Sequence, residues 1–357
     1  MNTTSLESFK KEINQIREYF KHIQYVNDMV DYTVLQTDKE QVKSSLNKLE
    51  DHYRSFGTDK KIFEYKASII SLYGLLEKYV ETWIKEYLDS LSSLVIEYNK
   101  IDEKIRSNHF ELSLKLINTI ISREIVKYQH ITKEQVLGKL NECIVNPTSY
   151  KFNTEAFVLL SGNLKHQQIV KLFELININL KELLKKNKSF IEYIEYEKQT
   201  PNIANLKTDN LYNKINELVE RRNHIAHGSE ILDILSISEL ELYIQFLEKY
   251  CQAIFETLAE EFIKQESIYT FTKIGVDKIS NIYNNRILAF EIENCTIKIG
   301  DMLIIETAES KFYKTPILTI QLNSKPYQEL PISEKTKIAV SVAHKIKQNQ
   351  TFYILKQ

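Results

Sequence analysis

The chain has 357 residues, of which 27% are charged and 43% hydrophobic, and this balance excludes an intrinsically disordered protein. The formal net charge is −1, so no overall field attracts the chain to nucleic acid or to acidic membranes. The three cysteines form no C-x-x-C pair, which argues against a zinc or redox centre and suits a reducing cytosol. Because we find no apolar signal segment and no run of about 18 apolar residues, we expect a cytoplasmic protein without membrane spans.

The first hundred residues predict long helices, in keeping with a chain that has only 7 Gly and 5 Pro. Apolar residues at three- and four-residue spacing predict a helix over residues 6–51. The segment from Ser55 to Lys60 contains Gly57 and predicts a break, after which a helix is expected over residues 62–99. We therefore expect an N-terminal helical arm of residues 1–58.

The next part of the chain predicts further helices. They are expected within residues 110–150, where Pro147 should end one of them, and over residues 164–184. A helix from Asp209 to His227 should stop at Gly228, because glycine is favoured just past a helix C-terminus. Residues 59–266 are thus expected to form one helical domain.

The sequence predicts one more helix, and after it the spacing of apolar residues changes from that of helices to that of strands. Ser238 and Glu241 match a capping box at the start of a helix that continues to about residue 264. Beyond it, short apolar runs with turn residues between them predict strands over residues 297–299, 303–305, 317–322, 338–342 and 352–355. We expect a small antiparallel β-barrel over residues 267–357, and hence an α+β multidomain protein that is mainly an α-helical bundle.

Arg222 is the unusual residue of the helix that ends at Gly228. At about 100° per residue it falls in the middle of an apolar stripe, and His227 points about 140° away from it. A guanidinium there needs a carboxylate, an interface or a ligand. Either the helix unwinds near Gly228 and brings His227 round, or a second subunit supplies its own pair. Alternatively, Arg222 pairs with a core acid and His227 merely caps the helix.

The segment LVERRNHIAHG, which contains these residues, resembles the signature of the HEPN superfamily of nucleases, R-x-x-x-x-H, often R-N-x-x-x-H. Arg222, Asn223 and His227 fit that signature without departure. The upstream segment ASIISLYGLLEKYVETWIKEYL, residues 67–88, resembles a helix of the RiboL-PSP-HEPN branch. The resemblance covers about residues 59–266.

The resemblance implies a helical bundle, a face-to-face homodimer joined through the helix from Asp209 to His227, and metal-independent endoribonuclease activity. Catalysis would fall to Arg222 and His227, with Asn223 holding the helix end or contacting phosphate. RNA carries its own nucleophile, the 2′-OH, so a histidine base and an arginine fork are suitable groups. We expect no metal and no cofactor, because the sequence shows no clustered ligand set.

The expected substrate is a cellular RNA (tRNA, rRNA or mRNA), and the expected role is that of a toxin or an antiviral-defence effector. The resemblance leaves room for an antitoxin or regulatory partner. The alternative is a non-catalytic HEPN-like scaffold that binds RNA or a protein, with Arg222 in a structural ion pair.

Two residues are supporting candidates. Glu77 places a carboxylate on a mostly apolar stripe and could pair with Arg222, unless the helix is rotated enough to expose it. His224 lies inside the signature but is not demanded by it. The C-terminal strands resemble domain 2 of translation elongation factors, although no GTPase segment accompanies them.

Overall fold

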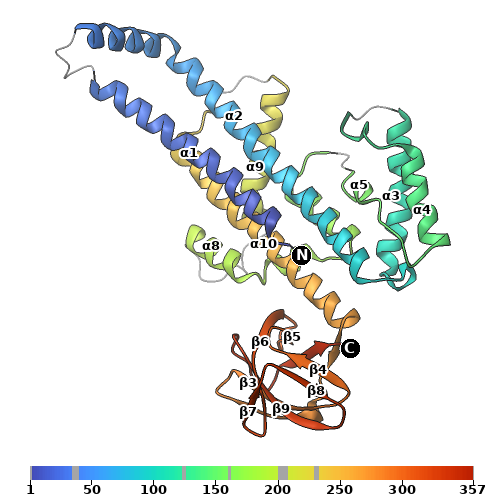
Figure 1. Ribbon diagram of the computed structural model, residues 1–357. Coiled ribbons are helices and arrows are strands. Elements are labelled where there is room, and N and C mark those ends of the chain that lie inside the picture. Colours follow the sequence, from blue (N-terminus) through green and yellow to red (C-terminus); the bar gives the residue numbers. More distant parts are fainter. Residues whose placement is uncertain are drawn as a thin grey trace.

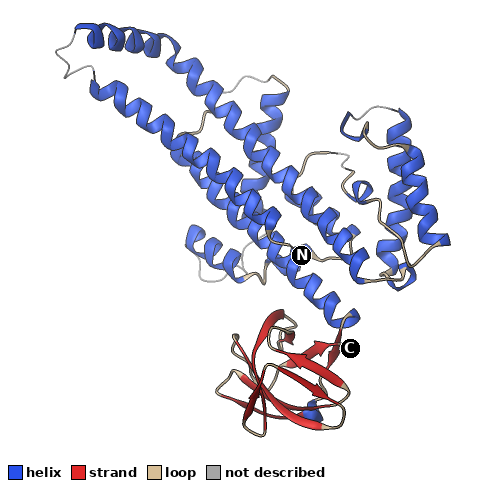
Figure 2. Cartoon of the chain, in the orientation of Figure 1, coloured by secondary structure: helices blue, strands red, loops and turns tan. Residues whose placement is uncertain are grey.

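The computed structural model describes residues 2–33, 40–122, 126–159, 162–199, 208–228 and 233–356. Its N-terminal and central parts are helical, and its C-terminal part is an antiparallel β half-barrel (Figures 1 and 2). The expected α+β fold, mainly helical, is therefore confirmed. The helices are α1 (Thr4–Thr33), α2 (Glu40–Leu94), α3 (Glu103–Ser122), α4 (Lys133–Val145), α5 (Thr154–Phe157), α6 (His166–Leu175), α7 (Leu180–Leu184), α8 (Lys188–Lys198), α9 (Thr208–Ala226) and α10 (Ile237–Tyr269).

Three long helices, α1, α2 and α10, pack against one another and form the centre of the helical part (Figure 1). Trp83 of α2 is fully buried between them, with its ring 5.8 Å from that of Phe9 on α1 and 5.7 Å from that of Phe255 on α10. Buried aromatic side chains remove a large apolar area from water, and edge-to-face pairs add to that stabilisation. These contacts bring α1 into the main hydrophobic core.

The break predicted between Ser55 and Lys60 is wrong. α2 runs without interruption from Glu40 to Leu94, and Gly57 lies inside it. A glycine in a helix interior costs only about 1 kcal/mol relative to alanine, which the packing of a long helix readily offsets. The predicted boundary after residue 58 thus falls within one continuous helix, and the residues before it share the core of the residues after it.

The predicted helix over residues 164–184 is two helices. α6 ends at Leu175 and α7 begins at Leu180, and between them Asn177 adopts a φ of 58°, in the left-handed region. Asparagine tolerates that region better than most residues, so the backbone can turn there. The stop before Pro147 is confirmed, because α4 ends at Val145.

The capping box of α10 is shifted by two residues from its predicted place. Ser236, not Ser238, is the N-cap, and its side chain accepts a hydrogen bond from the amide of Glu239 while the Glu239 carboxylate accepts from the Ser236 amide. Both serines are followed three residues later by a glutamate, so the sequence pattern fits either position.

The β half-barrel begins two residues after α10 ends. Its strands are β1 (Phe271–Lys273), β2 (Ile279–Tyr283), β3 (Ile287–Ile292), β4 (Cys295–Lys298), β5 (Met302–Glu306), β6 (Phe312–Leu322), β7 (Lys325–Tyr327), β8 (Glu329–Ile332), β9 (Thr336–Val342) and β10 (Thr351–Leu355). All pairings are antiparallel, in the order β1-β10-β5-β6-β9-β3-β2, with β7 on β6 and β4 paired to β8. The predicted strands correspond to β4, β5, β6, β9 and β10.

The half-barrel has its own hydrophobic core, separate from that of the helices. Val340 of β9 lies opposite Leu288 of β3 on one side and Ile320 of β6 on the other, and all three side chains are fully buried. Alternate residues of these strands point inward, as period-2 patterning requires. None of the described helices is long and apolar enough to cross a membrane.

Candidate functional site

The candidate site lies at the C-terminal end of α9, which packs on α2. Leu211, Ile215, Leu218 and Val219 form the buried face of α9, as the helical spacing predicted. Gly228 has a φ of 67° and ends the helix in the left-handed conformation. The fold therefore fixes the last two turns of α9, which carry the signature residues, against a rigid helix.

Arg222 is half-buried and held by neutral groups. Its Nη1 donates to Asn163 Oδ1 at 3.3 Å and to Asn223 Oδ1 at 3.2 Å. The guanidinium carbon lies 4.8 Å from the centre of the Tyr73 ring on α2, within cation–π range. Among the described residues, no protein group accepts a hydrogen bond from Nε or Nη2 of Arg222. That edge of the guanidinium is available to a ligand.

The neighbouring Arg221 is held very differently. It forms an ion pair with Asp233 at 2.8 Å and donates to the Tyr65 hydroxyl at 3.0 Å. Tyr65 and Tyr73 are eight residues apart on α2 and lie on the same side of that helix. Two consecutive arginines of α9 thus contact two tyrosines of α2, but only Arg221 has a carboxylate partner in the described part of the chain.

The pairing of Glu77 with Arg222, one of two possibilities that the sequence left open for Glu77, is not present in the structure. Glu77 is half-buried one turn beyond Tyr73, and no ion pair or hydrogen bond joins it to Arg222. Burial raises the pKa of the Tyr73 hydroxyl, and the charges of Glu77 and Arg222 act on that hydroxyl in opposite directions. The Tyr73 ring and two asparagine side chains contact Arg222 where a core carboxylate was one of the possible partners.

His227 lies on another side of the helix from Arg222. Its backbone amide donates to the Asn223 carbonyl oxygen at 2.9 Å, which is the helical i to i−4 bond. The helix therefore does not unwind before His227, and the two side chains remain about 140° apart. The imidazoles of His227 and His224 are exposed, and within the described residues neither has a hydrogen-bonding partner. One chain by itself does not bring Arg222 and His227 together.

The RiboL-PSP-HEPN family model matches residues 33–260, which is more than half of the chain and includes α2, α9 and the signature. The chain belongs to the RiboL-PSP-HEPN family. This membership connects it with ribonuclease-like or RNA-binding functions. A search of curated proteins finds no match.

One solved structure with a similar segment is GDP-bound aIF5B from Aeropyrum pernix. The match is 14% identical, covers 39% of this chain and 23% of that chain, and has a TM-score of 0.16. This chain therefore spans less than a quarter of that protein. The likeness is too weak to support any conclusion about fold or function.

The sequence of this RiboL-PSP-HEPN chain did not indicate two residues that contact Arg222, namely Tyr73 and Asn163. Tyr73 lies on a helical apolar stripe and reads as an ordinary core residue, which its exposure of 5% also fits. Asn163 stands in a loop before α6 and belongs to no recognisable motif. Only the packing of α2 and this loop on α9 shows that both contact Arg222.

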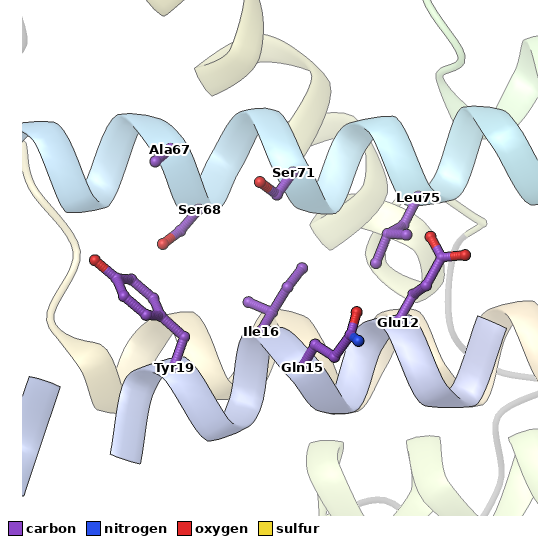
Figure 3. Close-up of a pocket in the computed structure, with 8 residues that line it drawn as sticks. All are labelled: Glu12, Gln15, Ile16, Tyr19, Ala67, Ser68, Ser71 and Leu75. Atoms are coloured by element: carbon purple, nitrogen blue, oxygen red, sulfur yellow. The ribbon is translucent and has the colours of Figure 1, made fainter. Parts of the chain in front are cut away.

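A groove of about 360 Å³ lies elsewhere, between α1 and α2 (Figure 3). Small side chains of α2, Ala67, Ser68 and Ser71, face Ile16 and Tyr19 of α1 across it. Neither Arg222 nor His227 lines this groove. Among the described residues, no group of three or more His, Cys, Asp or Glu side chains is placed to hold a metal ion.

Proposed function

We propose that this protein is a metal-independent endoribonuclease in which Arg222 and His227 are the catalytic residues. The observation that carries the proposal is the state of Arg222: neutral groups hold it in place, and its Nε–Nη2 edge has no acceptor in the part of the chain that the structure describes. A planar fork of two N–H donors fits a phosphate. The exposed imidazole of His227 at the end of the same helix adds a group that can accept or donate a proton.

The chemistry uses the ribose 2′-OH as the nucleophile. His227 takes the 2′-OH proton, and the 2′ oxygen attacks the adjacent phosphorus. The bond from phosphorus to the 5′ oxygen then breaks, and that oxygen takes the proton that the imidazole of His227 removed from the 2′-OH, so that the imidazole is neutral again. Arg222 stabilises the charge that builds on the phosphorane oxygens. The products are a 2′,3′-cyclic phosphate and a 5′-OH.

The active unit is a homodimer, since one continuous helix directs Arg222 and His227 apart. A two-fold axis beside α9 would place two arginines and two histidines in one cleft. A feature of α2 supports this arrangement. Phe63 and Ile70, seven residues apart on α2, leave 68% and 43% of their side chains exposed, next to the helix face that carries Tyr73. Such an apolar face is suited to burial in an interface.

The substrate is a cellular RNA, and the role is that of a toxin or a defence effector. A non-catalytic RNA-binding scaffold remains the competing function. Its support is the cation–π contact of Arg222 with Tyr73, which by itself stabilises the fold. Because both a nuclease and a scaffold bind RNA, only a cleavage assay distinguishes the two functions.

The test is cleavage of a 5′-labelled RNA by the purified full-length chain. We expect wild type to give fragments ending in a 2′,3′-cyclic phosphate, and Arg222→Ala and His227→Ala each to be inactive while still folded, as shown by a cooperative thermal unfolding transition. His130 is an exposed histidine outside the site, so His130→Ala should keep full activity. RNA binding without cleavage by the wild-type protein would favour the scaffold.

A further inference from the structure

We infer that Tyr73 and Asn163 are positioning residues that hold the Arg222 guanidinium with its Nε–Nη2 edge directed to an RNA phosphate. The inference rests on the proposed function and extends it to two residues outside the RiboL-PSP-HEPN signature. Neither residue contacts the reacting atoms. Both act through Arg222.

The ring of Tyr73 supports the guanidinium from α2. Because this ring is buried and belongs to a rigid helix, it gives Arg222 a fixed flat surface at 4.8 Å. The face of an aromatic ring carries partial negative charge and attracts a cation without forming a salt bridge. Arg222 therefore keeps its full charge for a ligand.

Asn163 fixes the rotation of the guanidinium in its own plane. Its Oδ1 and that of Asn223 both accept from Nη1, so the donors without a partner among the described residues are on the opposite edge, Nε and Nη2. Arg221 shows the contrast, because the carboxylate of Asp233 accepts from its Nη2. The two acceptors on Arg222 are neutral, so among the described residues no group neutralises its charge or accepts from its Nε–Nη2 edge.

The loop that carries Asn163 is itself attached to both helices. The amide of Leu164 donates to the Tyr73 hydroxyl at 3.3 Å. On α9, Lys165 forms an ion pair with Glu220 at 2.9 Å, and Asn216 Oδ1 accepts from the His166 amide at 3.1 Å. Tyr73 thus has two functions: its ring lies against Arg222, and its hydroxyl anchors the loop that supplies Asn163.

Substitution of Tyr73 or Asn163 should therefore lower catalysis while the protein still folds. A group held in its productive geometry before substrate binds lowers the barrier, because no reorganisation is needed during the reaction. Loss of the supports should therefore lower kcat by more than it raises KM. Tyr73→Phe keeps the ring and loses only the hydroxyl contact, whereas Tyr73→Leu loses the surface under the cation.

The experiment compares kcat and KM of wild type, Tyr73→Phe, Tyr73→Leu and Asn163→Ala, with Tyr65→Leu as the matched control. Tyr65 is buried on the same helix and contacts Arg221 instead of Arg222. We expect kcat to fall about 10-fold in Tyr73→Leu and Asn163→Ala, and less than about threefold in Tyr73→Phe and Tyr65→Leu. An equal fall of kcat in Tyr73→Leu and Tyr65→Leu, at similar melting temperatures, would overturn the inference.

A second measurement does not depend on cleavage. A fluorescent 2′-O-methyl oligonucleotide, which has no nucleophile, reports phosphate binding by anisotropy. Tyr73→Leu should weaken binding in the wild-type background and change it little in the Arg222→Ala background, because Tyr73 acts through Arg222. Additive effects in the double mutant would overturn the inference. A wild type that binds this RNA without cleaving RNA would refute the proposed catalysis alone, whereas one that does not bind it would refute both.

Discussion

The amide of His227 donates to the carbonyl oxygen of Asn223 at 2.9 Å, so His227 keeps the helical register of α9. Asn223 meanwhile accepts from Arg222 through its side chain. One residue therefore fixes the directions of both signature side chains, and it fixes them about 140° apart. If both residues catalyse, as we propose, we expect a productive pair of Arg222 and His227 to come from two copies of the chain.

Mixing two inactive variants tests that conclusion. In a heterodimer of Arg222→Ala and His227→Ala, one shared pair is doubly broken and the other is intact. We expect about a quarter of wild-type activity from an equal mixture at full exchange, because half of the dimers are mixed and each has one working pair. Cleavage rates after denaturation and joint refolding measure this. Recovery indistinguishable from zero, in a sample shown to contain mixed dimers, would contradict a shared site.

Replacement of Arg222 by lysine should fail almost as completely as replacement by alanine. Lysine keeps the charge but lacks the planar fork that Asn163 and Tyr73 hold in place. We expect a loss of about 100-fold or more in kcat, by analogy with the removal of other transition-state donors. Single-turnover cleavage assays give the number. Arg221→Lys is the matched control and should retain most activity; a fully active Arg222→Lys would show that charge alone is sufficient.

Cleavage should survive EDTA and should require the 2′-OH on the 5′ side of the cleaved phosphate. The reason is that Arg222 and His227 supply charge stabilisation and proton transfer, and the RNA supplies its own nucleophile. An oligonucleotide with a single 2′-deoxy substitution at the cleavage site should be cut at least about 100-fold more slowly. Activity that disappears with EDTA and returns with Mg²⁺ or Mn²⁺ would point to a metal-dependent nuclease instead.

The folded protein should lose stability as the pH falls from about 6.5 towards 4. Burial lowers the pKa of His109 and of His166 to about 4. Between those pH values the unfolded chain binds protons that the folded chain does not, so the stability present at neutral pH declines. Each histidine should contribute about 1–2 kcal/mol of loss at pH 5.

Urea unfolding at pH 7 and pH 5 measures this loss. His109 accepts from the Asn153 amide at 2.9 Å, and glutamine can replace that acceptor without titrating. The loss between the two pH values should therefore be smaller in His109→Gln than in wild type. His130→Gln, at an exposed position, should behave like wild type. An equal pH dependence in all three proteins would show that the buried histidine does not titrate on unfolding.

Some features of the fold could be predicted because they depend on local periodicity. The buried face of α9, the stop at Gly228, the stop before Pro147 and five strands of the half-barrel all follow from spacing and turn chemistry. The signature could likewise be found from the sequence, since its residues, Arg222, Asn223 and His227, lie within six consecutive positions. Whether they catalyse remains a prediction.

Other features were decided by packing. Gly57 predicted a break because glycine is a poor helix former, yet the neighbouring helical contacts keep α2 intact. Five strands, β1, β2, β3, β7 and β8, were not predicted from the sequence, and each of them is paired with a neighbouring strand in the sheets.

The sequence by itself determined which residues of α9 face the core and where the helix ends, because both depend on neighbours within a few positions. Only the tertiary structure decided what holds Arg222. Tyr73 is 149 positions before it and Asn163 is 59 positions before it, and nothing local to either residue marks it as a partner. The packing of α2 and the loop before α6 onto α9 brings them together. The guanidinium, for which the sequence left open a carboxylate, an interface or a ligand, is held by an aromatic ring and two amide oxygens, and no described residue accepts a hydrogen bond from its Nε–Nη2 edge.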